Sequence, residues 1–106
     1  MSNKAQVTVV NNVVSVDIDK LRPDDAPTTL EWKLKTPGWS FTATGIVIDN
    51  VSVQFSNPTR KNNGNTFTWD DANSDGLTYK YTIWVQQGSN APIGLDPLIT
   101  NKKPPL

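Results

Sequence analysis

Alternation of apolar and polar residues in short segments is the feature that most limits how this chain can fold. In residues 30–35, Leu, Trp and Leu alternate with Glu, Lys and Lys. In residues 79–86, Tyr79, Tyr81, Ile83 and Val85 take every second position. Successive side chains of a strand point to opposite faces, so this period of two predicts half-buried β-strands and gives no support for helices.

Composition and turn signals extend this prediction to the whole chain. The 106 residues include eight Pro, six Gly, one Met and a single Glu, so strong helix formers are scarce. We expect further strands within residues 6–10, 14–18, 39–48, 51–55, 66–69 and 93–99, the last interrupted at Asp96-Pro97. Asn62-Asn63-Gly64-Asn65 predicts a hairpin turn. The sequence therefore predicts an all-β protein, an antiparallel two-sheet β-sandwich of immunoglobulin-like outline with seven to nine short strands.

Length and charge limit the organisation and the partners. The length fits one domain, which we place at residues 1–100, with a flexible C-terminal tail at residues 101–106. No apolar run has the length of a signal peptide or of a membrane span, so we expect a cytoplasmic location and no membrane partner. Lys+Arg and Asp+Glu both number 10, and this balance argues against a nucleic-acid partner.

Missing residue types exclude most catalytic mechanisms. The chain contains no His and no Cys, so Ser-His-Asp and Cys-His arrangements and thiolate metal sites are impossible. It also contains no glycine-rich phosphate loop, and its one Glu gives little basis for a carboxylate pair across a cleft. We therefore expect no enzymatic activity and no cofactor, calcium aside.

One motif has a specific chemistry. Asp71-Ala72-Asn73-Ser74-Asp75-Gly76 fits the opening of a calcium-binding loop, in which oxygen ligands at Asp71, Asn73 and Asp75 would surround the cation. The twelfth position of such a loop would be Thr82, which has no carboxylate, and a strand follows where an EF-hand has a helix. The alternative interpretation is a polar turn, in which Asp, Asn and Gly serve backbone geometry.

Trp84 is the second candidate. Its neighbours of the same parity, Lys80, Thr82 and Gln86, are polar, so the indole should face away from the buried side of the strand. An exposed Trp can stack on a sugar ring or anchor a partner protein. The alternative is that Trp84 is covered, as side chains on both faces of central strands often are. Trp39 follows Pro37-Gly38 and is a second candidate for such a ligand platform.

Two segments resemble a known group of sequences. Residues 77–83, LTYKYTI, followed by residues 94–101, GLDPLITN, are similar to the C-terminal half of the DP-EP family of small bacterial proteins. Leu30-Glu31-Trp32, Trp39-Ser40-Phe41 and Gly45-Ile46 occur in the same order and spacing as in that group. The resemblance covers about half of the chain and implies a compact bacterial sandwich, with no activity or ligand attached. The chain has no Glu-Pro pair, because its only Glu precedes Trp32.

These observations predict a non-catalytic binding or interaction module whose partner is a protein or a glycan. Two alternatives remain open. One is a structural or self-associating protein that forms homo-oligomers through exposed edge strands at its first or last segment. The other is a calcium-dependent carbohydrate-binding domain that combines the loop at residues 71–75 with an aromatic platform.

Overall fold

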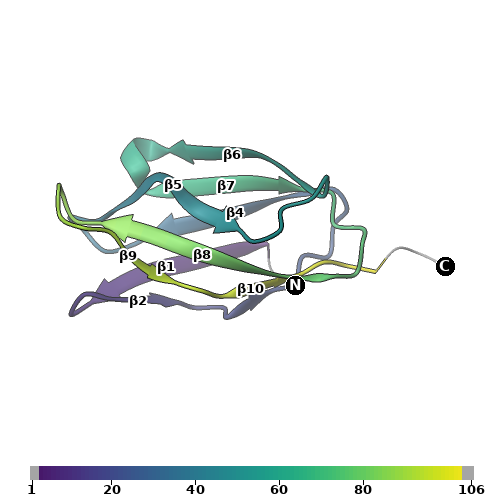
Figure 1. The fold of residues 1–106 in the computed structure, drawn as a ribbon, viewed down its shortest axis with the longest axis horizontal. Coiled ribbons are helices and arrows are strands. Elements are labelled where there is room, and N and C mark those ends of the chain that lie inside the picture. The colour runs from purple at the N-terminus through teal and green to yellow at the C-terminus, as the bar shows by residue number, and fades with distance from the viewer. Residues whose placement is uncertain (1–2, 104–106) are drawn as a thin grey trace.

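The computed structural model describes residues 3–103, which form two five-stranded β-sheets packed against each other (Figure 1). One sheet has the order β2-β1-β4-β7-β6, and the other has the order β3-β10-β8-β5, with β9 paired to β8 beside β10. The elements are β1 Lys4–Val10, β2 Val13–Val16, β3 Lys20–Leu21, β4 Thr28–Leu34, β5 Ser40–Ile48, β6 Phe55–Lys61, the 3₁₀ turn η1 Asn62–Gly64, β7 Thr66–Asp71, β8 Thr78–Gln86, β9 Ile93–Leu95 and β10 Leu98–Thr100. The all-β prediction is confirmed.

Both sheets are mixed, which corrects the prediction of antiparallel sheets. β1 lies parallel to β4, and β10 lies parallel to β3, while the other strand pairs are antiparallel. The described residues form ten strands instead of seven to nine, because the short β3 and the division of the last segment into β9 and β10 add to the count. Alternation identifies the faces of a strand, but it carries no information about the direction of its partner.

The core lies between the two sheets and follows the alternation. Every inward residue of β4 and β8 that the sequence indicated is buried, with Trp32 and Tyr81 fully enclosed. The Trp32 indole Nε1 donates a hydrogen bond of 2.9 Å to the Tyr81 hydroxyl, and the ring centroids are 5.3 Å apart. This contact joins the middle strand of one sheet to a central strand of the other.

Asparagines with positive φ make two of the tight turns. Asn11 and Asn12, at φ 52° and 61°, connect β1 to β2. Asn62 and Asn63 share φ 56° in η1, and Gly64 follows at φ 86°. The predicted turn at residues 62–65 is therefore confirmed, because Asn and Gly tolerate the left-handed region that these turns require.

The predicted strand at residues 51–55 is wrong. Val51 and Val53 are not part of a strand, and Val53 is 98% exposed in the loop before β6. β6 instead begins at Phe55 and continues through Pro58. Proline has no backbone N–H, and an edge strand tolerates it because one side of the strand forms no ladder hydrogen bonds.

The predicted tail is held at its start, since the Asn101 N–H donates to the Leu77 carbonyl and Asn101 is 3% exposed. Residues 104–106 of that tail lie outside the described residues.

We predict that Tyr81→Phe lowers the free energy of unfolding by about 1–3 kcal/mol, because it leaves the buried Trp32 N–H without an acceptor. Urea denaturation of the wild type, Tyr81→Phe, Trp32→Phe and the double variant measures this effect. The loss of unfolding free energy in the double variant should be smaller than the sum of the losses in the two single variants, since the two side chains share one hydrogen bond. Losses that simply add would show that this hydrogen bond contributes nothing.

Candidate functional site

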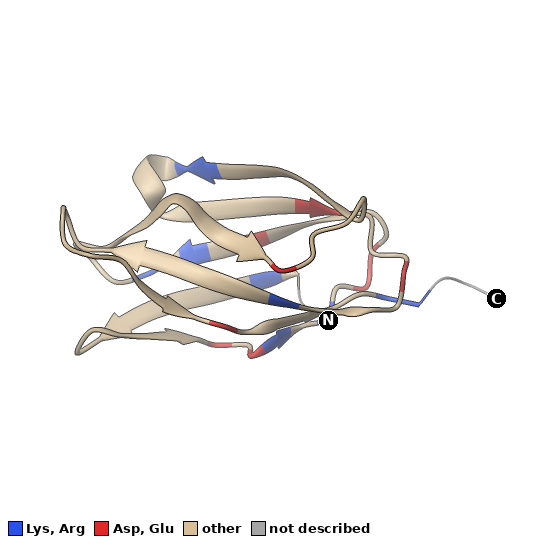
Figure 2. Ribbon diagram, in the orientation of Figure 1, with Lys and Arg blue, Asp and Glu red and all other residues tan. Residues whose placement is uncertain are grey.

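The predicted calcium loop connects β7 to β8 at one end of the molecule. Figure 2 shows acidic residues at the end of β7 and in the loop that follows it. The Asp71 Oδ1 accepts a hydrogen bond of 2.8 Å from the Asn73 N–H. Asp75 Oδ1 accepts from the Leu77 N–H, and Asp75 Oδ2 accepts from the Tyr79 hydroxyl at 2.6 Å. The first two are the side-chain-to-backbone bonds that fix a turn, and the third joins two side chains.

Asn73 joins this loop to two distant segments. Its Nδ2 donates to the carbonyls of Pro23 and Asp25, at 3.0 and 2.8 Å, and its Oδ1 accepts from the Lys102 N–H at 2.6 Å. The amide is therefore fully used within the protein. Within residues 3–103, no group of three or more acidic side chains is placed to hold a metal ion. The contacts agree with the turn interpretation, and the calcium interpretation stays a prediction.

Asp71 is a carboxylate that is only 1% exposed, as deeply buried as Asn73. Desolvation by burial raises the pKa of its carboxyl to about 6, the charge of Asp75 adds to the rise, and hydrogen bonds from Asn73 and Asn101 oppose it. Within the described part of the chain, neither the buried Asp71 Oδ2 nor the buried Asn101 Oδ1 has a hydrogen-bond partner. The Asn101 amide is oriented by its Nδ2, which donates to Asp75 Oδ1 at 3.0 Å.

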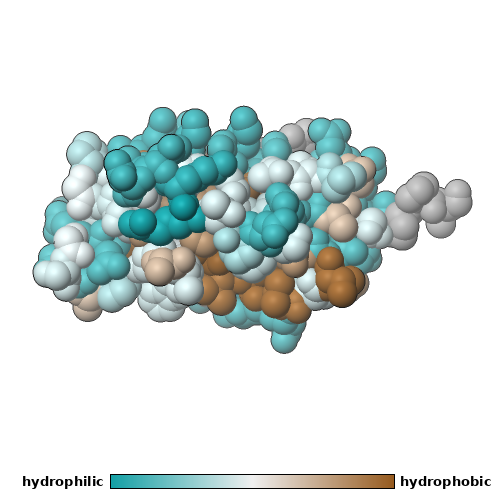
Figure 3. Space-filling view, turned by 90° about the horizontal axis from the view of Figure 1, so that it is seen from above, coloured by the Kyte–Doolittle hydropathy of each residue, from teal (hydrophilic) through white to brown (hydrophobic). Residues whose placement is uncertain are grey.

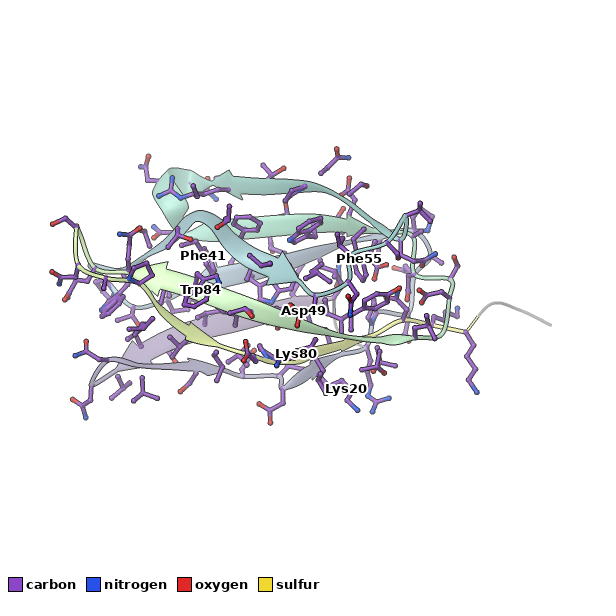
Figure 4. The ribbon with its side chains drawn as sticks, viewed as in Figure 1. Lys20, Phe41, Asp49, Phe55, Lys80 and Trp84 are labelled. Atoms are coloured by element: carbon purple, nitrogen blue, oxygen red, sulfur yellow. The ribbon has the colours of Figure 1, made fainter. Side chains whose placement is uncertain are left out.

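Trp84 lies on the outer face of β8, and the indole is 38% exposed. In Figure 4 it occupies the half of β8 near Phe41 of β5, and Lys80 lies farther toward the start of the strand. A Cβ built on Gly94 of β9 would come within 3.0 Å of Cε3 and Cζ3 of the indole. The six-membered ring is therefore held closely against the backbone of the neighbouring strand.

A hollow of about 530 Å³ opens beside this indole. Its lining consists of Thr42, Ala43, Thr44, Trp84, Gln86 and Pro92. The Thr and Ala residues come from a bulge in β5, where the pairing with β8 shifts between Phe41 and Ile46. Gly45 permits this bulge, because a Cβ there would lie 2.6 Å from that of Phe41. The bulge thus moves the middle of β5 away from Trp84 and leaves the space between them.

An apolar groove of about 240 Å³ continues from the hollow along the other side of β5, sharing Ala43 and Thr44 with it. Its remaining lining residues are Ile46, Val47, Ile48, Val51, Pro58, Phe67 and Trp69. Figure 3 shows an apolar area on one face of the molecule. Of the residues that line the groove, Val47 and Val51 are half-exposed. The surface of β5 is therefore apolar on one flank and mixed on the other.

The structure separates the residues that the sequence grouped together. Trp39 is half-buried, packs against the core and does not line the hollow, so it forms no common platform with Trp84 there. The loop at residues 71–75 precedes Thr78, and the path from Thr78 to Trp84 along β8 is about 20 Å at the rise of a strand. Sequence reasoning missed Thr42, Thr44, Gln86 and Pro92, and the lack of alternation in residues 45–48 was the only signal of the bulge that gathers them.

Comparison with known proteins adds no relatives: no protein-family model matches this chain, and no curated protein does either. The resemblance to the DP-EP family therefore stays an expectation from the sequence. Among residues 3–103, no helix is long and apolar enough to cross a membrane.

We predict that Asp71→Asn gains stability relative to the wild type as the pH rises from 4 to 7. A carboxyl whose pKa is raised to about 6 contributes stability that is complete below its unfolded value of 3.8 and is lost as the pH rises through 6. The free energy of unfolding of Asp71→Asn, taken relative to that of the wild type, should rise by on the order of 2–3 kcal/mol over this pH range. Denaturant unfolding at several pH values measures it, with Asp49→Asn on the surface as the control for net charge. A difference that does not vary with pH would contradict the prediction.

We also predict equal melting temperatures in excess calcium and in excess EDTA, since most carboxylate and amide oxygens of the loop already accept hydrogen bonds. A cation that binds only the folded state would raise the free energy of unfolding by about 2.7 kcal/mol when its concentration is 100 times its dissociation constant. Calorimetry would detect the corresponding rise of roughly 10 °C, and such a rise would establish the calcium site.

Proposed function

We propose that this chain is a non-catalytic binding module built on an immunoglobulin-like sandwich, and that its partner binds in the hollow beside Trp84. The observation that supports the proposal is a half-exposed indole held against Gly94 and surrounded by polar groups of β5 and β8. Two packed five-stranded sheets support the sandwich outline. The bacterial origin and the cytoplasmic location stay expectations from the sequence.

The lining of the hollow supports binding over catalysis. None of its six residues carries an ionisable side chain, so the hollow offers no general acid, general base or charged nucleophile. The carboxyl with the raised pKa belongs to Asp71, the last residue of β7, which does not line this space. An aromatic surface with fixed polar neighbours is the usual composition of a ligand site.

Self-association through edge strands has less support. β1 lies between β2 and β4, and β10 lies between β3 and β8, so neither is the edge strand that the sequence suggested. The sheets end at β2, β6, β3 and β5. At the β5 edge, the outward carbonyls of Phe41 and Ile46 already accept hydrogen bonds from the side chains of Arg60 and Trp69. β6 contains Pro58 and a shift in pairing, and two residues interrupt the edge between β9 and β10. Such features hinder pairing with another chain.

We predict that Trp84→Ala strongly weakens binding while the fold is kept. The labelled protein is screened on arrays of immobilised glycans and of proline-rich peptides, and each ligand found is measured with the variant. We expect at least a tenfold loss of affinity, since the indole supplies the largest contact surface of the hollow. The cost in stability should not exceed about 2 kcal/mol, because the side chain is partly exposed.

Val53→Ala is the matched control, because it shortens an apolar side chain that is almost fully exposed outside the hollow. It should leave binding unchanged. Unfolding of Trp84→Ala would show that the indole is a core residue. Undiminished binding by a folded Trp84→Ala would place the contact elsewhere, and either result would refute the proposed site.

A further inference from the structure

We propose that the hollow beside Trp84 binds a neutral saccharide, one ring of which stacks on the indole while its hydroxyls bond to the side chains around it. The inference rests on the proposed function above and assigns its ligand class. It depends on three properties of the hollow: its aromatic surface, its unused hydrogen-bonding groups and its lack of charge.

The indole is placed as a rigid platform. Cε3 and Cζ3 approach the backbone at Gly94, so one side of the ring system is supported while 38% of the side chain stays exposed. The π-face of an indole carries partial negative charge, and it attracts the polarised C–H groups on the flat side of a sugar ring. The hollow of about 530 Å³ is wide open to solvent, so a ligand would be held on its surface instead of being enclosed.

Polar groups with free capacity surround this platform. Across residues 3–103, no hydrogen bond engages the side-chain hydroxyls of Thr42 or Thr44. Gln86 Nε2 donates to the carbonyls of Gly88 and Asn90, at 3.2 and 3.4 Å, which orients the amide and leaves its Oε1 as an acceptor. Two hydroxyls that donate and accept, together with a fixed carbonyl, match a ligand whose own hydroxyls do both.

Two polar side chains farther along this face of β8 already have a partner. Thr82 donates to Asp96 Oδ1 at 2.6 Å, and the Lys80 ammonium lies 3.7 Å from the same carboxylate. Thr82 therefore has no free hydroxyl donor to offer a ligand, in contrast to Thr42 and Thr44 at the hollow.

Charge narrows the ligand class further. The lining has no ionisable residue, and therefore nothing in it would compensate the charge of a phosphate, a nucleotide or an acidic or basic peptide. A proline-rich peptide would also stack on an indole. A proline ring has no hydroxyl groups, however, so it could not form hydrogen bonds with the two Thr hydroxyls and the Gln86 carbonyl. The hydrogen-bonding groups favour a polyol ring over proline.

Calcium has no part in this contact. The loop at residues 71–75 is about 20 Å from Trp84 along β8, beyond the reach of one sugar ring. Binding should therefore be the same in EDTA as in calcium. This separates the inference from the calcium-dependent carbohydrate-binding alternative, in which one ligand would contact both the cation and the aromatic platform.

The test is a titration of the ¹⁵N-labelled protein in EDTA, followed at the indole N–H resonances. The probes are neutral hexasaccharides, namely cello-, xylo-, manno-, laminari- and N,N′-diacetylchito-hexaose, with decaproline as the peptide probe. We expect at least one saccharide to shift the Trp84 resonance with a dissociation constant between about 10 µM and 10 mM, as for other weak sites. Decaproline should have no effect.

Variants then identify the contacts. Thr44→Val removes one hydroxyl at nearly constant volume, and it should weaken saccharide binding about three- to tenfold. Thr8→Val is the matched control, because Thr8 is an exposed strand residue of the other sheet and does not line the hollow. Gly94→Ala should also weaken binding, since the added Cβ would push the indole from its support.

The failure of this inference differs from that of the proposed function. A shift of the Trp84 resonance by decaproline and by no saccharide would overturn the ligand class and keep the binding site. Saccharide binding that Trp84→Ala does not weaken would overturn both. If no probe shifts Trp84 at about 10 mM, the saccharide inference is wrong, and the proposed site is then decided by the array screen with Trp84→Ala.

Discussion

The contact between Trp32 and Tyr81 sets the geometry on which the rest of the structure depends. It joins β4, the middle strand of one sheet, to β8 of the other, and it buries two aromatic side chains completely. Tyr81 can face the core only if every second residue of β8 does the same. Trp84 lies three positions farther along and must therefore point outward. The exposed indole is a geometric consequence of the core, and a one-residue slip in register would exchange the two faces.

The second constraint is the closure of the open side of the sandwich at β5. Arg60 and Trp69 of the opposite sheet donate to the outward carbonyls of β5, and they satisfy groups that would otherwise be available to another chain. Between these two anchor points, at Phe41 and Ile46, the strand bulges away from β8. The interaction that protects the edge therefore fixes both ends of the bulge, and the hollow beside Trp84 is a result of the same arrangement.

The sequence predicted the features that depend on near neighbours. Alternation identified β4 and β8 with their buried faces, Asn-Gly identified the turn at residues 62–65, and parity placed Trp84 on the outer face. The parallel pairing of β1 with β4 could not be predicted, because it joins strands that are separated by β2 and β3. The roles of Asn73 and Asn101 were missed for the same reason, since their partners lie 26 to 50 residues away in the chain.

Exposure alone would not distinguish Trp84 from other apolar side chains, because single exposed apolar residues are ordinary on protein surfaces. Val53 is far more exposed, yet it lies in a loop and lines none of the hollows described above. Trp84 differs in what surrounds it: a glycine that supports the ring, an amide oriented by two backbone carbonyls, and two hydroxyls that no side chain or carbonyl of residues 3–103 engages. Hydroxyls on a protein surface are satisfied by water, which a ligand can displace without loss only if it restores the same hydrogen bonds. A ligand that does so while covering the indole gains from the apolar contact, and this combination is the physical basis for expecting a ring with hydroxyl groups at this position.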